Sequence, residues 1–320
     1  MLELRYNPLT DEWIIVSAFT QKRPTRPKTT ECPICPGGVE FPGTYDLVSF
    51  DNKYPSLQLN PPNVVSESPI LKRKPAKGNC EVIVYTSNHQ SSLSEMPLLQ
   101  IEKLIEMWVD RTRDLMQYNF VKYIFIFENR GQEVGASLEH PHGQLYAFPF
   151  IPIRISRKLD AFEKGYEEHK KCVICKILEE ELSKKERIVY ENETMITIVP
   201  FYARFPYEVH IYPKRHVDSF LYLSGQEKKD LAKALKIITM KYDRLFNIPF
   251  PYMMMFFQSP VNTKDFSRIF HFHVEFNPPK RDKNKIKWMA SVETGTWTFI
   301  NPKIPEEAAQ ELRNIKVEVK

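Results

Sequence analysis

The chain has 320 residues, of which 42% are hydrophobic and 27% are charged, and its formal net charge is +5. This length allows two domains of ordinary size, and no apolar run approaches the roughly eighteen residues that a membrane span needs. The charge suits a polyanionic substrate but is too small and too dispersed for a nucleic-acid surface, so we expect neither a membrane nor a nucleic-acid partner.

The N-terminal stretch MLELRYNPLTDEW mixes acidic and apolar residues and lacks the continuous apolar region of a signal peptide. We therefore expect a cytoplasmic protein. Four of the five cysteines form two CxxC pairs, at Cys32 and Cys35 and at Cys172 and Cys175. In a cytoplasmic chain, such pairs usually bind metal or carry out redox chemistry rather than form a disulfide framework.

Prolines and glycines crowd the first pair in ECPICPGG, residues 31–38. A thioredoxin-like redox pair would stand at the start of a helix after a strand. This composition instead predicts a tight, non-helical knuckle, the shape that lets two thiolates reach one zinc ion.

The elements that follow the knuckle are a strand, a helix and a second strand. EVIVYT (residues 81–86) predicts a strand that ends shortly before His89. Residues 97–118 place Leu104, Trp108 and Leu115 at helical spacing, so we expect one face of this helix to pack on a sheet. VKYIFIF (residues 121–127) predicts the next strand, and HPHGQLYAF (residues 140–148) follows it.

The second half repeats these parts in the same order. After a second knuckle at Cys172 and Cys175 come a strand at residues 208–215 with His216 behind it, a helix at 226–246, a strand at 251–257 and HFHVEF at 271–276. Internal duplication explains this order better than chance does. The chain turns proline-containing and basic near residues 150–158, which predicts a division into domains 1–155 and 156–320. We expect an α+β fold in which each domain is an antiparallel sheet with packed helices.

The HPHGQ segment predicts the chemistry. In a strand His140 and His142 share one face, and Pro141 places them at a strand start or on an edge. Cys32, Cys35, His89 and His140 complete a closed Cys2His2 set, which makes the zinc structural. His142 is left as a nucleophile, held beside a metal-anchored neighbour.

Gln144 lies on the same face, and its amide can bind a phosphoryl oxygen but cannot exchange a proton with water or substrate. A phosphoryl-imidazole intermediate would therefore wait for a second acceptor. Upstream, Gly135 and Ser137 supply a flexible backbone and a hydroxyl, and Asn129 is placed to bind a ribose or its phosphate. These features predict nucleotidyl transfer through a covalent histidine.

FENRGQEVGASLEHPHGQ (residues 127–144) resembles the galactose-1-phosphate uridylyltransferase family of the histidine triad superfamily. RYNPLTDEWIIVS, ECPICPGG, FDNKYPSL, VPFYARFPYEVHIYPKRH and PEEAAQELR are similar to other parts of that family, so the resemblance covers nearly the whole chain. It implies two tandem histidine-triad-like domains and a cytoplasmic homodimer. It also implies that UMP passes from UDP-glucose through His142 to galactose 1-phosphate, releasing glucose 1-phosphate and then UDP-galactose.

The resemblance also implies roles for individual residues. Gln144 holds the phosphoryl group, and Asn52, Asn129 and the segment Gly135, Ala136, Ser137 contact the nucleotide. Lys287 and Glu293 match residues that help to form the partner's sugar site. Arg23 is a candidate phosphate contact within KRPTRPK, although such a run of charge is usually a solvated face.

Some positions depart from the family's pattern. Lys53 stands where some members have an acid beside the uridine asparagine, and Thr20 where some have an arginine. Some members bind a second metal through a glutamate and three histidines, but Gln258 and Glu275 occupy two of those positions. By the internal repeat we predict instead a second zinc at Cys172, Cys175, His216 and His271, with reduced or disulfide-linked cysteines as the alternative.

Two other functions fit the same residues. One is transfer of AMP rather than UMP, for example between ADP-glucose and phosphate. The other is a zinc-stabilised nucleotide-binding protein without turnover, in which replacing His142 would leave every ligand response unchanged. Hydrolysis as the main reaction is disfavoured by Gln144.

Overall fold

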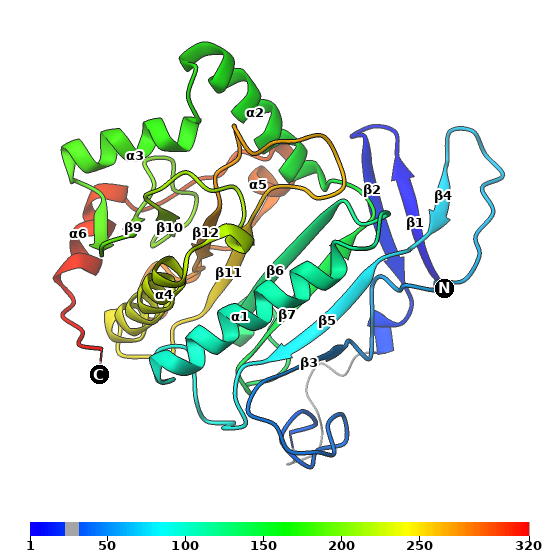
Figure 1. The fold of residues 1–320 in the computed structure, drawn as a ribbon, viewed down its shortest axis with the longest axis horizontal. Helices are drawn as coiled ribbons and strands as arrows, with labels where there is room; N and C mark the ends of the chain where they lie inside the picture. Colours follow the sequence, from blue (N-terminus) through cyan, green and yellow to red (C-terminus); the bar gives the residue numbers. More distant parts are fainter. Residues whose placement is uncertain (23–31, 320) are drawn as a thin grey trace.

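The two predicted halves join edge to edge. The computed structural model of the chain describes residues 1–22 and 32–319, and it contains one nine-stranded sheet in the order β3-β5-β7-β6-β11-β12-β10-β9-β8 (Figure 1). The first half supplies β3, β5, β7 and β6, and the second half supplies the other strands. The halves meet where β6 pairs antiparallel with β11, with Phe127 opposite Met255.

The strands are β1 (Leu2–Asn7), β2 (Glu12–Ser17), β3 (Val48–Asp51), β4 (Arg73–Pro75), β5 (Asn79–Val84), β6 (Tyr123–Arg130), β7 (His142–Phe148), β8 (Ile188–Glu191), β9 (Met195–Ile198), β10 (Val209–Pro213), β11 (Tyr252–Phe257) and β12 (His273–Asn277). The helices are α1 (Leu98–Leu115), α2 (Ile153–His169), α3 (Val173–Lys184), α4 (Gly225–Leu245), α5 (Ser291–Thr296) and α6 (Pro305–Asn314). Short 3-10 turns are η1 (Thr20–Lys22), η2 (Gln132–Val134) and η3 (Phe220–Tyr222).

Strand alternation gives the sheet two different faces. Ile83, Ile126 and Leu145 point to one face, where they form a single core with residues of α1 and α4 such as Trp108 and Leu235. Figure 1 shows these two helices in front of the strands. In the second half, residues of α2 and α3 form a separate core with side chains of β9, β10 and β11. This second face carries the predicted reactive residues.

The predicted fold class is confirmed: both halves consist of antiparallel strands with packed helices. One predicted feature differs in the structure. The second cysteine pair is not a knuckle like the first, because Cys172 is the residue directly before α3 and Cys175 lies in the first turn of that helix. The reason is local, since the sequence between the second pair lacks the prolines and glycines that surround the first. The division at residue 155 stays a prediction.

A smaller sheet, in the order β2-β1-β4, lies beside the main one and was not predicted. Its short strands β1 and β2 are joined by a turn in which Asp11 has a φ of 52°.

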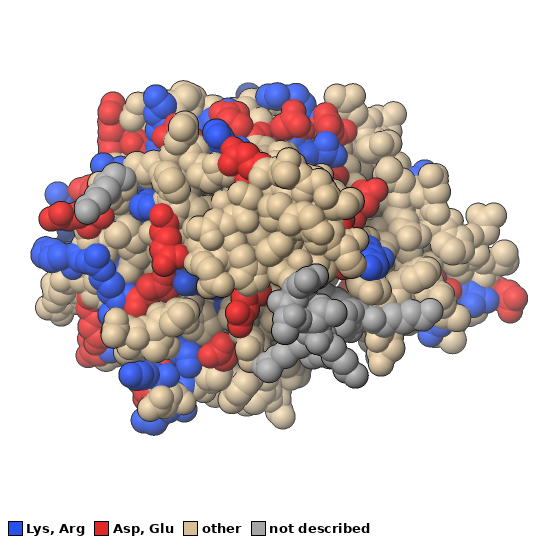
Figure 2. Space-filling view, turned by 90° about the horizontal axis from the view of Figure 1, so that it is seen from below, with Lys and Arg blue, Asp and Glu red and all other residues tan. Residues whose placement is uncertain are grey.

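The face of the molecule drawn in Figure 2 carries acidic and basic side chains intermixed around a broad uncharged area. Basic side chains therefore do not form a continuous patch on that face. Within the described ranges, no helix combines the length and apolarity that crossing a membrane requires.

Candidate active site and metal centres

The predicted ligands of the first metal site lie together. The Sγ atom of Cys35 is 3.4 Å from Nδ1 of His89 and 3.3 Å from Nδ1 of His140, and Sγ of Cys32 is 3.8 Å from Nδ1 of His140. Zinc bonds of about 2.3 Å to sulfur and about 2.0 Å to nitrogen place such atoms about 3.6 Å apart in a tetrahedron. The spacing therefore fits one tetrahedral ion.

The protonation states of His140 and the two cysteines also favour binding of a metal cation. The Nε2 atom of His140 is 2.7 Å from the carbonyl oxygen of Thr86, which can only accept, so Nε2 carries the hydrogen and Nδ1 presents its lone pair to the thiols. Burial lowers the pKa of His140, which favours the neutral ligand form. Burial and the adjacent Cys32 raise the pKa of Cys35 to about 11, so two thiolates need a compensating positive charge.

The ligands of the second predicted site lie together in the same way. Sγ of Cys175 is 3.4 Å from Nδ1 of His216 and 3.5 Å from Nδ1 of His271, and Cys172 completes the group. The opposite ring nitrogens donate to the carbonyl oxygens of Ser267 and Pro213. All five cysteines, including this pair, are free thiols in the structure.

The candidate nucleophile His142 is the first residue of β7. Its Nδ1 lies 2.8 Å from the carbonyl oxygen of His140, so Nδ1 donates the hydrogen bond and the neutral ring keeps its lone pair on Nε2. The metal ligand His140 thus sets both the orientation and the tautomer of its neighbour. His142 is 8% exposed and lines a cavity of about 1110 Å³.

That cavity brings together part of the predicted nucleotide site. Asn129, Ala136 and Ser137 line it with His140 and His142. Gly135 ends η2 in a left-handed conformation with a φ of 82°, which glycine adopts without strain. Four further residues that were not predicted also line the cavity: Gln90, Ser91, Ser92 and Glu139. The polar run QSSLS directly after His89 was the available signal.

Gln144 lies two residues after His142 on the same strand and is 8% exposed. The side chain of Asn52, which follows β3, donates a 3.3 Å hydrogen bond to its Oε1. Lys53 is half exposed and lies 3.8 Å from a carboxylate oxygen of Glu40, so it is an ion-paired surface residue in this chain.

Two predicted contacts lie away from this cavity. Lys287 and Glu293 form a buried ion pair with each other at 2.5 Å, and neither lines the cavity beside His142. Arg23 lies outside the described residues.

The second half contains a closed counterpart of the site. Nδ1 of His273 donates to the carbonyl oxygen of His271 at 2.8 Å, as His142 does to that of His140. However, the ammonium of Lys158 on α2 lies 2.6 Å from Nε2 of His273 and 2.6 Å from Oε1 of Glu275. His273 is 2% exposed. A buried side chain of this protein therefore occupies the position next to the second imidazole.

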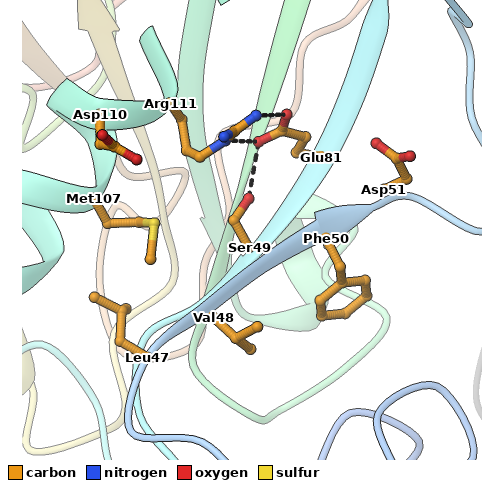
Figure 3. A pocket seen from close by; sticks show the side chains of 9 residues that line it. All are labelled: Leu47, Val48, Ser49, Phe50, Asp51, Glu81, Met107, Asp110 and Arg111. Atoms are coloured by element: carbon orange, nitrogen blue, oxygen red, sulfur yellow. Dashed lines mark hydrogen bonds and ion pairs between the residues drawn. The ribbon is translucent and has the colours of Figure 1, made fainter. Parts of the chain in front are cut away.

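A further cavity, of about 490 Å³, lies between β3, β5 and α1 (Figure 3). Its principal charges are neutralised internally, since Arg111 donates to both carboxylate oxygens of Glu81 at 2.8 Å and Ser49 donates to one of them. It holds none of the predicted site residues. The cavity at His142 is accordingly the candidate active site.

Family models match almost the entire chain. The galactose-1-phosphate uridyl transferase N-terminal domain matches residues 1–152, and the C-terminal domain of the same description matches residues 158–319. The chain belongs to the galactose-1-phosphate uridylyltransferase family. The predicted resemblance is thereby confirmed.

Known relatives and solved structures resemble the chain over most or all of their lengths. The galactose-1-phosphate uridylyltransferase of Thermotoga maritima is 66% identical over 320 residues, covering 100% of both chains. That of Saccharomyces cerevisiae is 33% identical, covering 97% of this chain and 93% of the yeast protein. A solved uridylyltransferase has a TM-score of 0.88 at 35% identity and covers 97% of each chain. An ADP-glucose phosphorylase from Arabidopsis thaliana, solved with bound ADP-glucose, has a TM-score of 0.77 at 27% identity and covers 99% of this chain and 100% of its own.

Proposed function

We propose that this uridylyltransferase-family enzyme moves UMP between UDP-glucose and galactose 1-phosphate. The observation that carries the proposal is the hydrogen bond from His142 Nδ1 to the His140 carbonyl, which leaves Nε2 as the nucleophilic nitrogen. Family membership supplies the substrates.

The reaction proceeds in two displacements at one phosphorus atom. First, the Nε2 lone pair of His142 forms a bond to the α-phosphorus of UDP-glucose, the bond from that phosphorus to the bridging oxygen breaks, and glucose 1-phosphate leaves with the electron pair. Then a phosphate oxygen of galactose 1-phosphate attacks the uridylyl group, the bond to Nε2 breaks, and UDP-galactose departs. No proton transfer to or from the leaving group is needed, because each leaving group is a stable anion or a neutral imidazole.

Gln144 supports both displacements by hydrogen bonding a phosphoryl oxygen as negative charge develops there. Asn129, Ala136 and Ser137 line the cavity that receives the nucleotide, and Gly135 lets the backbone approach it. Asn52 and Lys53 lie at the edge of the sheet nearer Gln144, and Arg23 is proposed to meet a phosphate. These roles are inferred from position and family likeness.

We further propose zinc at both Cys2His2 groups. Two thiolates with two imidazoles are the donor set that zinc prefers, and four protein ligands leave no open position for catalysis. The ion beside His140 would anchor the residue whose carbonyl holds His142. The ion at Cys172, Cys175, His216 and His271 would tie α3 to the segment just before β12 and to the loop after β10.

A homodimer in the cytoplasm completes the proposal. The segment that carries Lys287 and Glu293 also exposes Trp288, which is 66% exposed, and Trp297, which is 59% exposed. Large apolar side chains exposed on one segment are typical of protein interfaces. A second copy of the chain would cover them and place Lys287 or Glu293 near the sugar of its partner's substrate.

Product analysis tests the reaction directly. Purified protein is mixed with galactose 1-phosphate and UDP-glucose, or with phosphate and ADP-glucose, and the sugar nucleotides are separated. We expect UDP-galactose from the first mixture, no turnover in the second, and loss of UDP-galactose formation in His142→Ala but not in His169→Ala, whose histidine is exposed on the end of α2. Turnover of ADP-glucose alone would favour the adenylyl-transferring alternative, and activity in His142→Ala would exclude the covalent mechanism.

A further inference from the structure

The side chain of Asn52 has a fixed orientation. Its backbone N–H donates to the carbonyl oxygen of Cys80 at 2.8 Å, which ties the residue to β5. Its Oδ1 accepts the backbone N–H of Tyr54 at 2.9 Å, forming an Asx turn. Because the amide oxygen is held by the backbone, the NH2 group at Nδ2 must point away from Tyr54.

The Nδ2 group points to Gln144. It donates to Oε1 of Gln144 at 3.3 Å, although the two residues are 92 positions apart in the sequence. An amide has one oxygen that accepts and one nitrogen that donates, so a donor at Oε1 determines which way the Gln144 side chain is turned. Within residues 1–22 and 32–319, the Nε2 group of Gln144 has no hydrogen-bond partner, and it lies on the strand face that His142 occupies.

We propose that Asn52 is a positioning residue that keeps the NH2 group of Gln144 directed at the phosphoryl group. This inference rests on the proposed function and extends it. Phosphoryl oxygens are negative, so an amide nitrogen stabilises them, whereas an amide oxygen turned toward them repels them. The Tyr54 backbone N–H fixes the Asn52 amide, and the Asn52 amide in turn fixes the Gln144 amide. Both displacements benefit from this orientation, because both develop negative charge on the same phosphoryl oxygens.

A double-mutant cycle tests whether Asn52 acts through Gln144. Asn52→Asp keeps the oxygen that accepts from Tyr54 but replaces the donor with a second acceptor, so the Gln144 amide turns its NH2 group toward Asp and presents Oε1 to the substrate. Release of glucose 1-phosphate from UDP-glucose in a single turnover is measured for the native chain, Asn52→Asp, Gln144→Ala and the double variant. We expect Asn52→Asp to slow release by about 10²-fold in the native background and by less than about threefold beside Gln144→Ala.

The UDP-glucose concentration that gives the half-maximal rate should change little, because the lost interaction belongs to the transition state. Asn60→Asp, an exposed residue of the same segment, is the matched control for added charge and should keep the native rate. Asn52→Ala provides a second variant if the aspartate disturbs folding, and it should also be slow, with a thermal midpoint near that of the native chain.

Equal slowing by Asn52→Asp with and without Gln144 would overturn the inference, since Asn52 would then act on the substrate by itself. A raised half-maximal UDP-glucose concentration with an unchanged rate would overturn it in favour of a nucleotide contact. Failure of the proposed function is a different result: the native chain itself would release no glucose 1-phosphate.

Discussion

His142 and His273 have the same local geometry in opposite surroundings. Each donates from Nδ1 to the carbonyl oxygen two residues earlier, so each keeps its lone pair on Nε2. His142 lines a cavity, whereas the ammonium of Lys158 lies against His273. Burial, followed by the nearby positive charge of Lys158, lowers the pKa of His273 to about 3, so it stays neutral. The hydrogen bond that sets the tautomer is therefore present in both halves of the chain. Only His142 also lines a cavity that could hold a substrate, which makes it the candidate catalytic residue.

Gln144 should protect the uridylyl-histidine intermediate from hydrolysis until a sugar phosphate binds. Histidine at this position can transfer a proton, which glutamine cannot, and would assist attack by water. We expect Gln144→His to hydrolyse the uridylyl enzyme at least about tenfold faster than the native chain. The decay of isolated uridylyl enzyme in buffer measures this rate, with Gln144→Ala as the control for loss of the amide. Equal decay of the histidine and alanine variants would contradict the role assigned to Gln144.

Glu128 should make stability fall with rising pH. It is buried on the helix-covered face, where Tyr252 donates to its Oε1 at 3.0 Å, and burial raises its pKa from 4.5 to about 7. Between these values the folded protein keeps a proton that the unfolded chain has lost. The contribution of Glu128 to the free energy of unfolding therefore decreases as pH rises through this window, by up to roughly 3 kcal/mol in total. Above pH 7 this contribution no longer changes with pH.

Glu128→Gln removes this proton from both states. Urea unfolding at several pH values between 5 and 8 should show the variant gaining stability relative to the native chain as pH rises. Parallel profiles for the two proteins would show that Glu128 ionises normally.

At the scale of elements, β7 depends on a glycine between its two reactive residues. A Cβ at Gly143 would collide with the Tyr85 hydroxyl and lie 3.0 Å from the Phe127 carbonyl oxygen. Gly143 thus lets the strand that carries His142 and Gln144 lie directly against the core on the helix-covered face. The sequence pattern predicted this strand, but the contact with Tyr85 depends on how β5 lies beside β7.

Gly143→Ala should destabilise the protein by about 1–3 kcal/mol, because the core must shift to accept the methyl group. Tyr85→Phe in the same chain should recover part of the loss by removing the colliding hydroxyl. Gly225→Ala is the matched control: Gly225 begins α4, no more distant part of the chain lies within 4 Å of the added Cβ, and the change should leave stability equal or slightly higher. Thermal unfolding compares the variants. Unchanged stability in Gly143→Ala would show that the strand moves freely.

At the scale of the whole molecule, two metal centres should stabilise the two halves separately. Elemental analysis should find two zinc ions per chain, and Cys35→Ser and Cys175→Ser should each lose one. Only Cys35→Ser should also slow uridylylation in the folded fraction, because only that site anchors His140. One ion per chain together with a mass two hydrogens lower would instead establish a disulfide between Cys172 and Cys175.

The duplicated arrangement was predictable because the same motifs occur in the same order in each half of the sequence: cysteine pair, strand, histidine, helix, strand and paired histidines. Both Cys2His2 groups are brought together as that order implied. The contacts between distant segments were not predictable in the same way. The family resemblance placed Asn52 and Gln144 on the same substrate, but no sequence pattern indicates the hydrogen bond between them. Likewise, no pattern near His273 indicates that Lys158 reaches it from α2. Such contacts depend on how elements pack, which residue spacing does not record.

The most direct test of covalent transfer through His142 is the intact mass of the protein after mixing with UDP-glucose in the absence of galactose 1-phosphate. The covalent mechanism predicts a gain equal to one uridylyl group, located at His142 by fragmentation, absent in His142→Ala, retained in His169→Ala and reversed when galactose 1-phosphate is added. An unchanged mass in the native chain, or a uridylyl group on another residue, would contradict it.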